Sequence, residues 1–141
     1  MSSVTVLAFD YGLRHIGVAV GNGLVASANP LAVVSAKNGS PDWTAIERLL
    51  KEWRPAELVV GLPLNMDGTD SDMSLKARKF ARQLQGRYAV NCNMVDERLT
   101  SFAAKQGRRD RGESLDFGQD TIDAEAACLI LQDFWRNQVS S

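Results

Sequence analysis

The hydrophobic pattern of the chain changes character at a turn-rich segment, Asn38–Asp42. Before this segment, short apolar runs are separated by brief glycine-containing turns, which predicts β-strands joined as antiparallel hairpins. After it, apolar residues recur at helical spacing in some stretches and as short continuous runs in others. A chain with this pattern is expected to form a mixed sheet, in which the later strands are added through helical connections.

The expected fold class is α/β, with a five-stranded mixed sheet flanked by helices on both faces. Three antiparallel strands come first, and parallel additions follow. The expected strands are Val4–Asp10, Ile16–Val20, Leu24–Ser27 continued by Leu31–Ser35, Glu57–Leu62 and Tyr88–Val95. The expected helices are Trp43–Trp53, Leu75–Leu84, a short stretch after Thr100, and Ala124–Phe134.

The chain has 141 residues, of which 45% are apolar and 23% are charged. This balance is ordinary for a soluble globular protein, and the length suits one domain, residues 1–141. The N-terminus has no pattern of a secretory signal, and no window is apolar enough to span a membrane, so we expect a cytoplasmic protein. Because the formal net charge is −1, local basic patches must carry any contact with nucleic acid.

Three carboxylates stand at the ends of distant elements. Asp10 closes the first expected strand, on the same face as Val6 and Ala8. Glu97 directly follows the fifth strand, and Asp123 lies in the first turn of the last helix. Each has an ordinary structural explanation: Asp10 as a turn former, Glu97 as a charged strand end, and Asp123 as an acid that stabilises a helix N-terminus.

Together, Asp10, Glu97 and Asp123 predict a metal site. Mg²⁺ and Mn²⁺ prefer carboxylate oxygens, and Mg²⁺ sites often combine such ligands with the phosphate oxygens of a substrate. Two ions about 4 Å apart can activate a water and stabilise the leaving oxygen of a phosphodiester. The pattern is therefore typical of metal-dependent phosphodiester hydrolysis, with one ion or two left open.

A polar loop and two basic clusters supply candidate contacts to nucleic acid. The loop Gly61–Asp72 follows an apolar strand, where sites in α/β sheets usually lie. Basic side chains can follow a phosphate backbone, and the alternative for those on the second helix is an ordinary solvated face. The candidate contacts are Arg14, Asn65, Lys76, Lys79, Arg98, Arg108 and Arg109.

Four segments resemble the YqgF/RuvX family: FDYGLRHIGVAV (9–20), VVGLPLNMDGT (59–69), DERLT (96–100) and IDAEAACLILQ (122–132). The resemblance covers about residues 4–134 and implies an RNase H-like fold. Members of the family are described as Holliday-junction resolvases and as nucleases for the 5′ end of pre-16S rRNA. By motif, the family's acidic triad falls on Asp10, Glu97 and Asp123. The family usually has Lys-Gly-Lys where this chain has Gln119-Asp120-Thr121.

The resemblance implies a hydrolase, an endonuclease that uses Mg²⁺ or Mn²⁺ to cleave structured nucleic acid. Its substrate would be precursor rRNA in ribosome biogenesis, branched DNA in recombination, or both, and its catalytic and metal-binding residues would be the acidic triad. Ribosome-assembly or transcription factors are further expected partners, and the protein would be a monomer or a weak homodimer.

Two alternatives stay open at this stage. The first is a non-catalytic, transcription-associated module that binds nucleic acid on the same fold. The second is an ATP-handling protein of the actin type, which the segment DYGLRHIGVAV suggests when it is read alone. The sequence assigns no role to His15.

Overall fold

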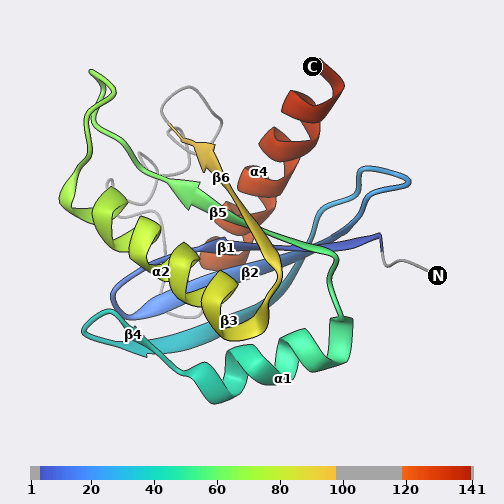
Figure 1. Cartoon of the computed structure of the whole chain (residues 1–141), viewed down its shortest axis with the longest axis horizontal. Coiled ribbons are helices and arrows are strands. Elements are labelled where there is room, and N and C mark those ends of the chain that lie inside the picture. Colours follow the sequence, from blue (N-terminus) through green and yellow to red (C-terminus); the bar gives the residue numbers. More distant parts are fainter. Residues whose placement is uncertain (1–3, 98–118, 141) are drawn as a thin grey trace.

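The computed structural model describes residues 4–97 and 119–140. In this part of the chain a six-stranded sheet has the order β4-β3-β2-β1-β5-β6 (Figure 1). The strands are β1 (Thr5–Asp10), β2 (His15–Asn22), β3 (Asn29–Lys37), β4 (Ser40–Pro41), β5 (Glu57–Leu62) and β6 (Asn91–Asp96). The helices are α1 (Trp43–Trp53), α2 (Asp72–Tyr88) and α4 (Gln119–Ser140).

The strand pairing confirms the expected mixed sheet. β1, β2, β3 and β4 pair antiparallel in succession, whereas β5 pairs parallel to β1 and β6 pairs parallel to β5. Each parallel strand is reached through a helix, α1 before β5 and α2 before β6. The carboxyl ends of β1, β5 and β6 therefore lie at one edge of the sheet, where sites in α/β proteins usually form.

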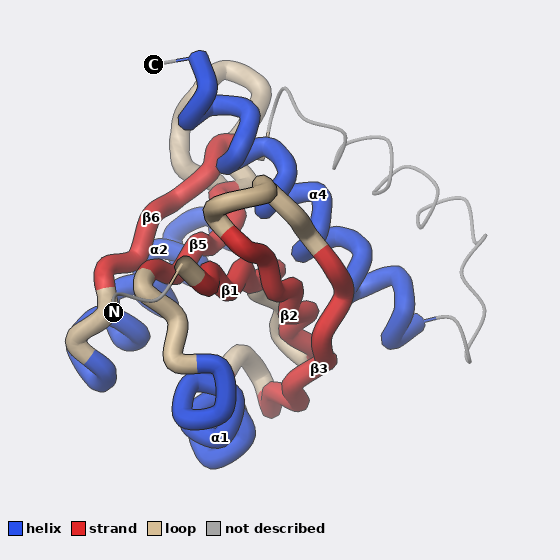
Figure 2. The backbone as a smooth tube through the Cα atoms, turned by 90° about the vertical axis from the view of Figure 1, so that its right-hand side faces the viewer, coloured by secondary structure: helices blue, strands red, loops and turns tan. Residues whose placement is uncertain are grey.

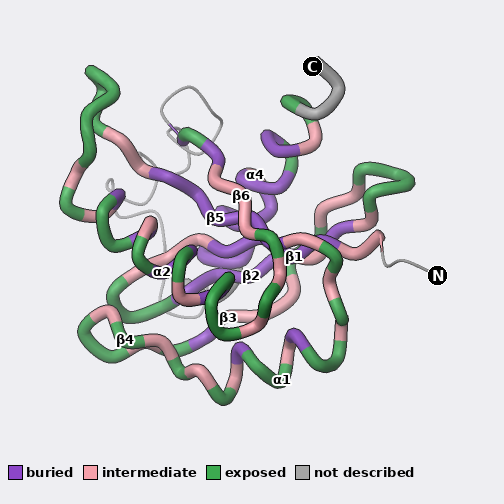
Figure 3. The backbone as a smooth tube through the Cα atoms, viewed as in Figure 1, coloured by how far each residue is buried: buried purple, intermediate pink, exposed green. Residues whose placement is uncertain are grey.

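Helices cover both faces of the sheet, as the sequence predicts (Figure 2). α1 and α2 pack on one face, and α4 packs on the other. In β1, Leu7 and Phe9 enter the core under α1 and α2, whereas Val6 and Ala8 enter the core under α4. A strand covered on both faces must be apolar at successive positions, which explains the continuous apolar run. Figure 3 shows the buried residues gathered in the central strands and along α4.

An extra strand occupies part of the segment that the sequence interpretation treats as a loop. Asn38 and Gly39 both have positive φ, 51° and 87°, as a two-residue hairpin turn requires. Lys37 then pairs with Ser40, so the short strand β4 extends the sheet beyond β3. The dipeptide Asn-Gly is a strong hairpin signal, and the loop interpretation did not use it.

The interpretation of Leu24–Ser27 as part of the third strand is wrong. The backbone N–H groups of Val25 and Ser27 both donate to the carbonyl oxygen of Asn22 at 3.3 Å. These bonds close a turn between β2 and β3, so the apolar residues of this segment lie on the surface. The short helix expected after Thr100 lies outside the described residues.

Local side chains set the start of the two helices on one face. Asp42 caps α1, and Ser71 and Ser74 form a reciprocal capping box at the start of α2. No helix within residues 4–97 and 119–140 has the length and apolar composition needed to cross a bilayer.

Candidate active site

The three predicted carboxylates come from three elements. Asp10 is the last residue of β1, and Glu97 directly follows β6, so both stand at the edge where the parallel strands end. Asp123 lies near the start of α4 and is buried. Because side chains alternate along a strand, Asp10 shares the face of Val6 and Ala8, which is the face that α4 covers.

Two glycines flank Asp10 on the neighbouring strands. In the antiparallel pair of β1 and β2, Asp10 lies opposite Gly17. In the parallel pair of β1 and β5, Phe9 lies opposite Val60, which puts Asp10 beside Gly61. Asp10 is therefore the one residue with a side chain in a row of three positions, and other parts of the chain pack closely against the glycine on each side.

Gly17 brings α4 against the sheet. A Cβ atom at this position would overlap the backbone carbonyl group of Asp123, so only glycine lets the helix start this close to β2. Since Gly17 lies opposite Asp10, the close approach brings the backbone of Asp123 to the face of the sheet that carries the Asp10 side chain. The sequence has no pattern that would show this contact, because Gly17 and Asp123 lie far apart along the chain.

Gly61 makes room for Glu97. A Cβ atom on Gly61 would overlap the Glu97 carboxylate and would lie 2.6 Å from Cδ1 of Ile130 in α4. The Glu97 side chain therefore folds back over β5, beneath α4, where its exposed fraction is only 6%. Its backbone N–H donates to the carbonyl oxygen of Leu62 at 3.1 Å, which fixes the chain as it leaves β6.

The electrostatics of Glu97 show that acidic groups crowd this space. The pKa of Glu97 is raised to about 9, mainly by burial and to a lesser extent by the negative charges of Asp10, Asp96 and Asp133. Burial disfavours the charged carboxylate, and like charges add to that effect. Asp133 lies on α4, is buried, and forms an ion pair with Arg136 at 3.0 Å.

The donor set fits a hard divalent cation. Carboxylate oxygens are the ligands that Mg²⁺ and Mn²⁺ prefer. A cation among these acids would offset the burial and the charge repulsion that together raise the pKa of Glu97. As they stand, the described residues include no three His, Cys, Asp or Glu side chains arranged as a metal-binding group. The assignment of Asp10, Glu97 and Asp123 as metal ligands therefore stays a prediction.

His15, which the sequence left without a role, faces this site. Its Nδ1 lies 4.0 Å from Oδ2 of Asp123, and its side chain is 45% exposed whereas that of Asp123 is 6% exposed. His15 begins β2 and shares a face with Gly17, two residues later. Period-two alternation along β2 predicts that His15 lies on the same face as Gly17. The contact with Asp123 could not be predicted, because it depends on where α4 crosses the sheet.

Hydrogen bonds within the polar loop between β5 and α2 fix its conformation. Nδ2 of Asn65 donates to Oγ1 of Thr69 at 3.0 Å and to the carbonyl oxygen of Asp70 at 3.2 Å. Hydrogen bonds from the Arg78 guanidinium, the larger effect, and from the Ser74 hydroxyl hold the pKa of Asp70 below its usual value. Asn65 is thus engaged in its own loop, and its contact with nucleic acid stays a prediction.

The basic side chains predicted to bind nucleic acid divide into three groups. Lys76 and Lys79 are exposed on α2, and both line a cavity between α2 and the hairpin of β3 and β4. Arg14 is exposed in the loop between β1 and β2, next to His15. The remaining predicted contacts, Arg98, Arg108 and Arg109, lie outside the described residues.

Solved structures share this architecture at low sequence identity. The chain matches Thermus thermophilus RuvC, solved with a Holliday junction substrate, with a TM-score of 0.55 and 17% identity over 96% of each chain. It matches the fowlpox virus Holliday junction resolvase with a TM-score of 0.51 and 15% identity, over 96% of this chain and 99% of that one. By its fold, the protein is therefore an α/β protein of the RNase H-like class.

The protein belongs to the family described as "RuvX: Holliday junction resolvase", whose model matches residues 4–137. A relative from Pseudomonas fluorescens (strain SBW25) is 54% identical over 128 residues, covering 90% of this chain and 88% of its own length. One from Salmonella newport (strain SL254) is 46% identical over 133 residues, covering 94% of this chain and 96% of its own length. Both carry the name "Putative pre-16S rRNA nuclease".

Proposed function

We propose that this chain is a metal-dependent endonuclease that hydrolyses phosphodiester bonds in structured nucleic acid. The observation that carries the proposal is the position of Asp10 between Gly17 and Gly61, through which the backbone of Asp123 and the carboxylate of Glu97 approach it. The family membership supports the same reaction class. The proposal treats residues 1–141 as one nuclease domain.

In this proposal Asp10, Glu97 and Asp123 hold Mg²⁺ or Mn²⁺. When bound, the metal supplies activation of a water and stabilisation of the leaving oxygen of the phosphodiester. The protein's own part is to hold the carboxylates on rigid elements and to limit the access of water to two of them, since Glu97 and Asp123 are 6% and 5% exposed. Exposed Lys76 and Lys79 bind phosphates of the substrate backbone.

The substrate that we favour is precursor 16S rRNA, since the relatives from Pseudomonas fluorescens and Salmonella newport are named pre-16S rRNA nucleases. The cleavage site that we propose on it lies near its 5′ end. Branched DNA is the second substrate to test, because the family is described by Holliday junctions. The setting would be the cytoplasm, where ribosome-assembly or transcription factors are candidate partners for a monomer or a weak homodimer.

The first experiment compares cleavage of labelled precursor rRNA and of labelled four-way DNA junctions, with Mn²⁺ and with a chelator. We expect the wild-type protein to cleave at least one substrate only with Mn²⁺, and Asp10→Asn to abolish that cleavage. Asp10→Asn should not unfold the protein, because an amide of the same shape replaces the carboxylate and one of the negative charges around Glu97 is removed. A second readout is thermal stabilisation by Mn²⁺, which the variant should lose.

The matched control is Glu52→Gln, which replaces an exposed carboxylate in the last turn of α1 by an amide. This variant should cleave and bind Mn²⁺ like the wild type. Full Mn²⁺-dependent cleavage by Asp10→Asn would contradict the assignment of the site. Binding of nucleic acid with no cleavage by the wild-type protein would instead support the non-catalytic module.

A further inference from the structure

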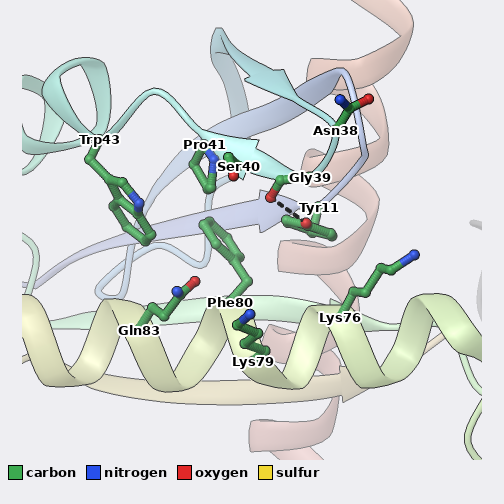
Figure 4. Close-up of a pocket in the computed structure, with 10 residues that line it drawn as sticks. All are labelled: Tyr11, Asn38, Gly39, Ser40, Pro41, Trp43, Lys76, Lys79, Phe80 and Gln83. Atoms are coloured by element: carbon green, nitrogen blue, oxygen red, sulfur yellow. Dashed lines mark hydrogen bonds between the residues drawn. The ribbon is translucent and has the colours of Figure 1, made fainter.

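A pocket lies at the same edge of the sheet, on the face opposite Asp10, Glu97 and Asp123. It is a cavity of about 190 Å³ between the end of β1, the hairpin of β3 and β4, the start of α1 and the middle of α2. Its residues are Tyr11, Trp43, Lys76, Lys79, Phe80 and Gln83, together with the hairpin segment 38–41 (Figure 4). We call it the aromatic–lysine pocket.

Three aromatic rings form one wall of this pocket. The ring centroids of Tyr11 and Phe80 lie 5.1 Å apart, and those of Trp43 and Phe80 lie 5.9 Å apart. The guanidinium of Arg87 lies 4.0 Å from the centroid of the Trp43 ring, which holds that ring in place. Tyr11 and Trp43 are partly exposed, whereas Phe80 is buried and supports them from the core.

The opposite wall is fixed by the hairpin. The hydroxyl of Tyr11 donates to the carbonyl oxygen of Gly39 at 2.6 Å, and the N–H of Gly39 donates to the carbonyl oxygen of Leu13 at 2.9 Å. These bonds fasten the tip of the hairpin to the end of β1. A pocket whose walls are already in place avoids the entropy cost of ordering them when a ligand binds.

The polar groups around the pocket favour an anion. Two lysines line it, and none of its lining residues is acidic. Figure 4 shows Lys76 and Gln83 rising from α2 on either side of Phe80, with Ser40 and Asn38 on the hairpin above. Arg78 and Arg82 continue the basic surface of α2 beside Lys79.

The size and place of the pocket suggest what enters it. A volume of about 190 Å³ is below the range of roughly 300–1,000 Å³ that is usual for drug-sized ligands, so the guest is one small ring system. Tyr11 directly follows Asp10, the last residue of β1, and packs against the core under α1 and α2, on the face opposite the Asp10 side chain. A strand of nucleic acid that passes around this edge could reach both sites within a few nucleotides.

We propose that the aromatic–lysine pocket receives one unpaired nucleotide of the nucleic-acid substrate. Its base lies against Tyr11 and Trp43, which Phe80 supports from the core, and its neighbouring phosphates contact Lys76 and Lys79. A base inside a duplex is stacked and cannot enter, whereas an unpaired base can stack on an aromatic side chain. The proposal rests on the proposed function only in taking nucleic acid as the substrate.

The test measures binding by fluorescence anisotropy with a chelator present, so that no cleavage occurs. The two probes are a blunt RNA duplex and the same duplex with a single-stranded extension. Gln83→Trp should fill the pocket from α2 without removing any ring of the wall, and should weaken binding of the extended probe roughly tenfold while sparing the blunt duplex. Lys76→Ala with Lys79→Ala should weaken the extended probe more than the blunt one.

The matched control is Lys51→Ala, which removes an exposed lysine on α1 that pairs with Glu47 at 3.7 Å, and it should change neither affinity. Photo-crosslinking from 5-iodouracil in the extension, followed by mass spectrometry, should identify the peptide that holds Tyr11 or Trp43. Equal affinity of Gln83→Trp and the wild type for the extended probe would overturn the proposal. Crosslinks confined to other peptides would also overturn it. Competition by a free mononucleotide at micromolar concentration would do so too, because it would indicate a site for a free nucleotide rather than for a nucleotide of the substrate strand.

The outcomes separate this proposal from the proposed function. Asp10→Asn should keep the preference for the extended probe although it loses cleavage. A wild-type protein that prefers the extension and cleaves nothing would contradict the nuclease and support the pocket. A protein that cleaves with Mn²⁺ but shows no preference for the extension would support the nuclease and contradict the pocket.

Discussion

At the scale of single residues, Gly17 and Gly61 determine how closely the other parts of the site approach Asp10. Gly17 faces the backbone of Asp123, which cannot move without moving α4. Gly61 faces the end of the Glu97 side chain, which can change rotamer, and Cδ1 of Ile130. The two positions should therefore respond differently to the same added methyl group.

We predict that Gly17→Ala lowers the free energy of unfolding by about 1–3 kcal/mol, because overpacking here pushes a helix away from the sheet. Gly61→Ala should cost less stability but should reduce cleavage strongly, because it displaces Glu97. Urea denaturation and the cleavage assay measure the two effects. Gly17→Ala with wild-type stability would contradict the close contact with α4.

Gly86→Ala is the matched control for both variants. Gly86 lies within α2, and a Cβ atom there would meet nothing within 4 Å. Alanine is the better helix former, so this change should raise the free energy of unfolding by about 0.4–1 kcal/mol and leave cleavage unchanged.

At the scale of elements, Ser71 connects the polar loop to α2. Its Oγ accepts the N–H of Ser74 at 3.0 Å and donates to the carbonyl oxygen of Pro63 at 2.6 Å. We predict that Ser71→Ala lowers the free energy of unfolding by about 1–2 kcal/mol, the usual cost of losing such a cap. Ser71→Thr keeps the hydroxyl and should recover most of the loss in thermal or urea denaturation. Equal destabilisation by both variants would argue against the cap.

The elements also show how far sequence reasoning reaches. The order of strands and helices follows from period-two and period-3.6 patterns, since these reflect local burial. The turn at Leu24–Ser27 escaped prediction because its apolar residues are exposed, so hydrophobicity alone misled. β4 is only two residues long, too short for a periodic pattern to show, and the Asn38-Gly39 turn was its only local signal.

The candidate site was predictable in part for the same reason. Asp10, Glu97 and Asp123 stand out because each carboxylate lies at or near the end of an element. The approach of His15 to Asp123 and the meeting of Tyr11 with the β3–β4 hairpin depend on how distant elements cross. No local pattern in the sequence carries that information.

At the scale of the whole molecule, the sheet separates two kinds of charge at one edge. The α4 face gathers buried carboxylates, and the α2 side presents exposed lysines and arginines. With a net charge of −1, the protein has no overall attraction for nucleic acid, so the basic side chains must attract the phosphates locally. In the proposed mechanism the acidic face would repel phosphates until a cation is bound, so we expect metal and substrate binding to be interdependent.

The central claim is that Asp10, Glu97 and Asp123 bind the metal that the reaction uses. The most direct measurement is a crystal structure of the protein soaked in Mn²⁺, with anomalous scattering recorded to locate the ion. The account predicts a Mn²⁺ peak coordinated by Asp10 and by at least one of Glu97 and Asp123, and absent from Asp10→Asn crystals. A peak elsewhere only, or the same peak in the variant, would contradict it.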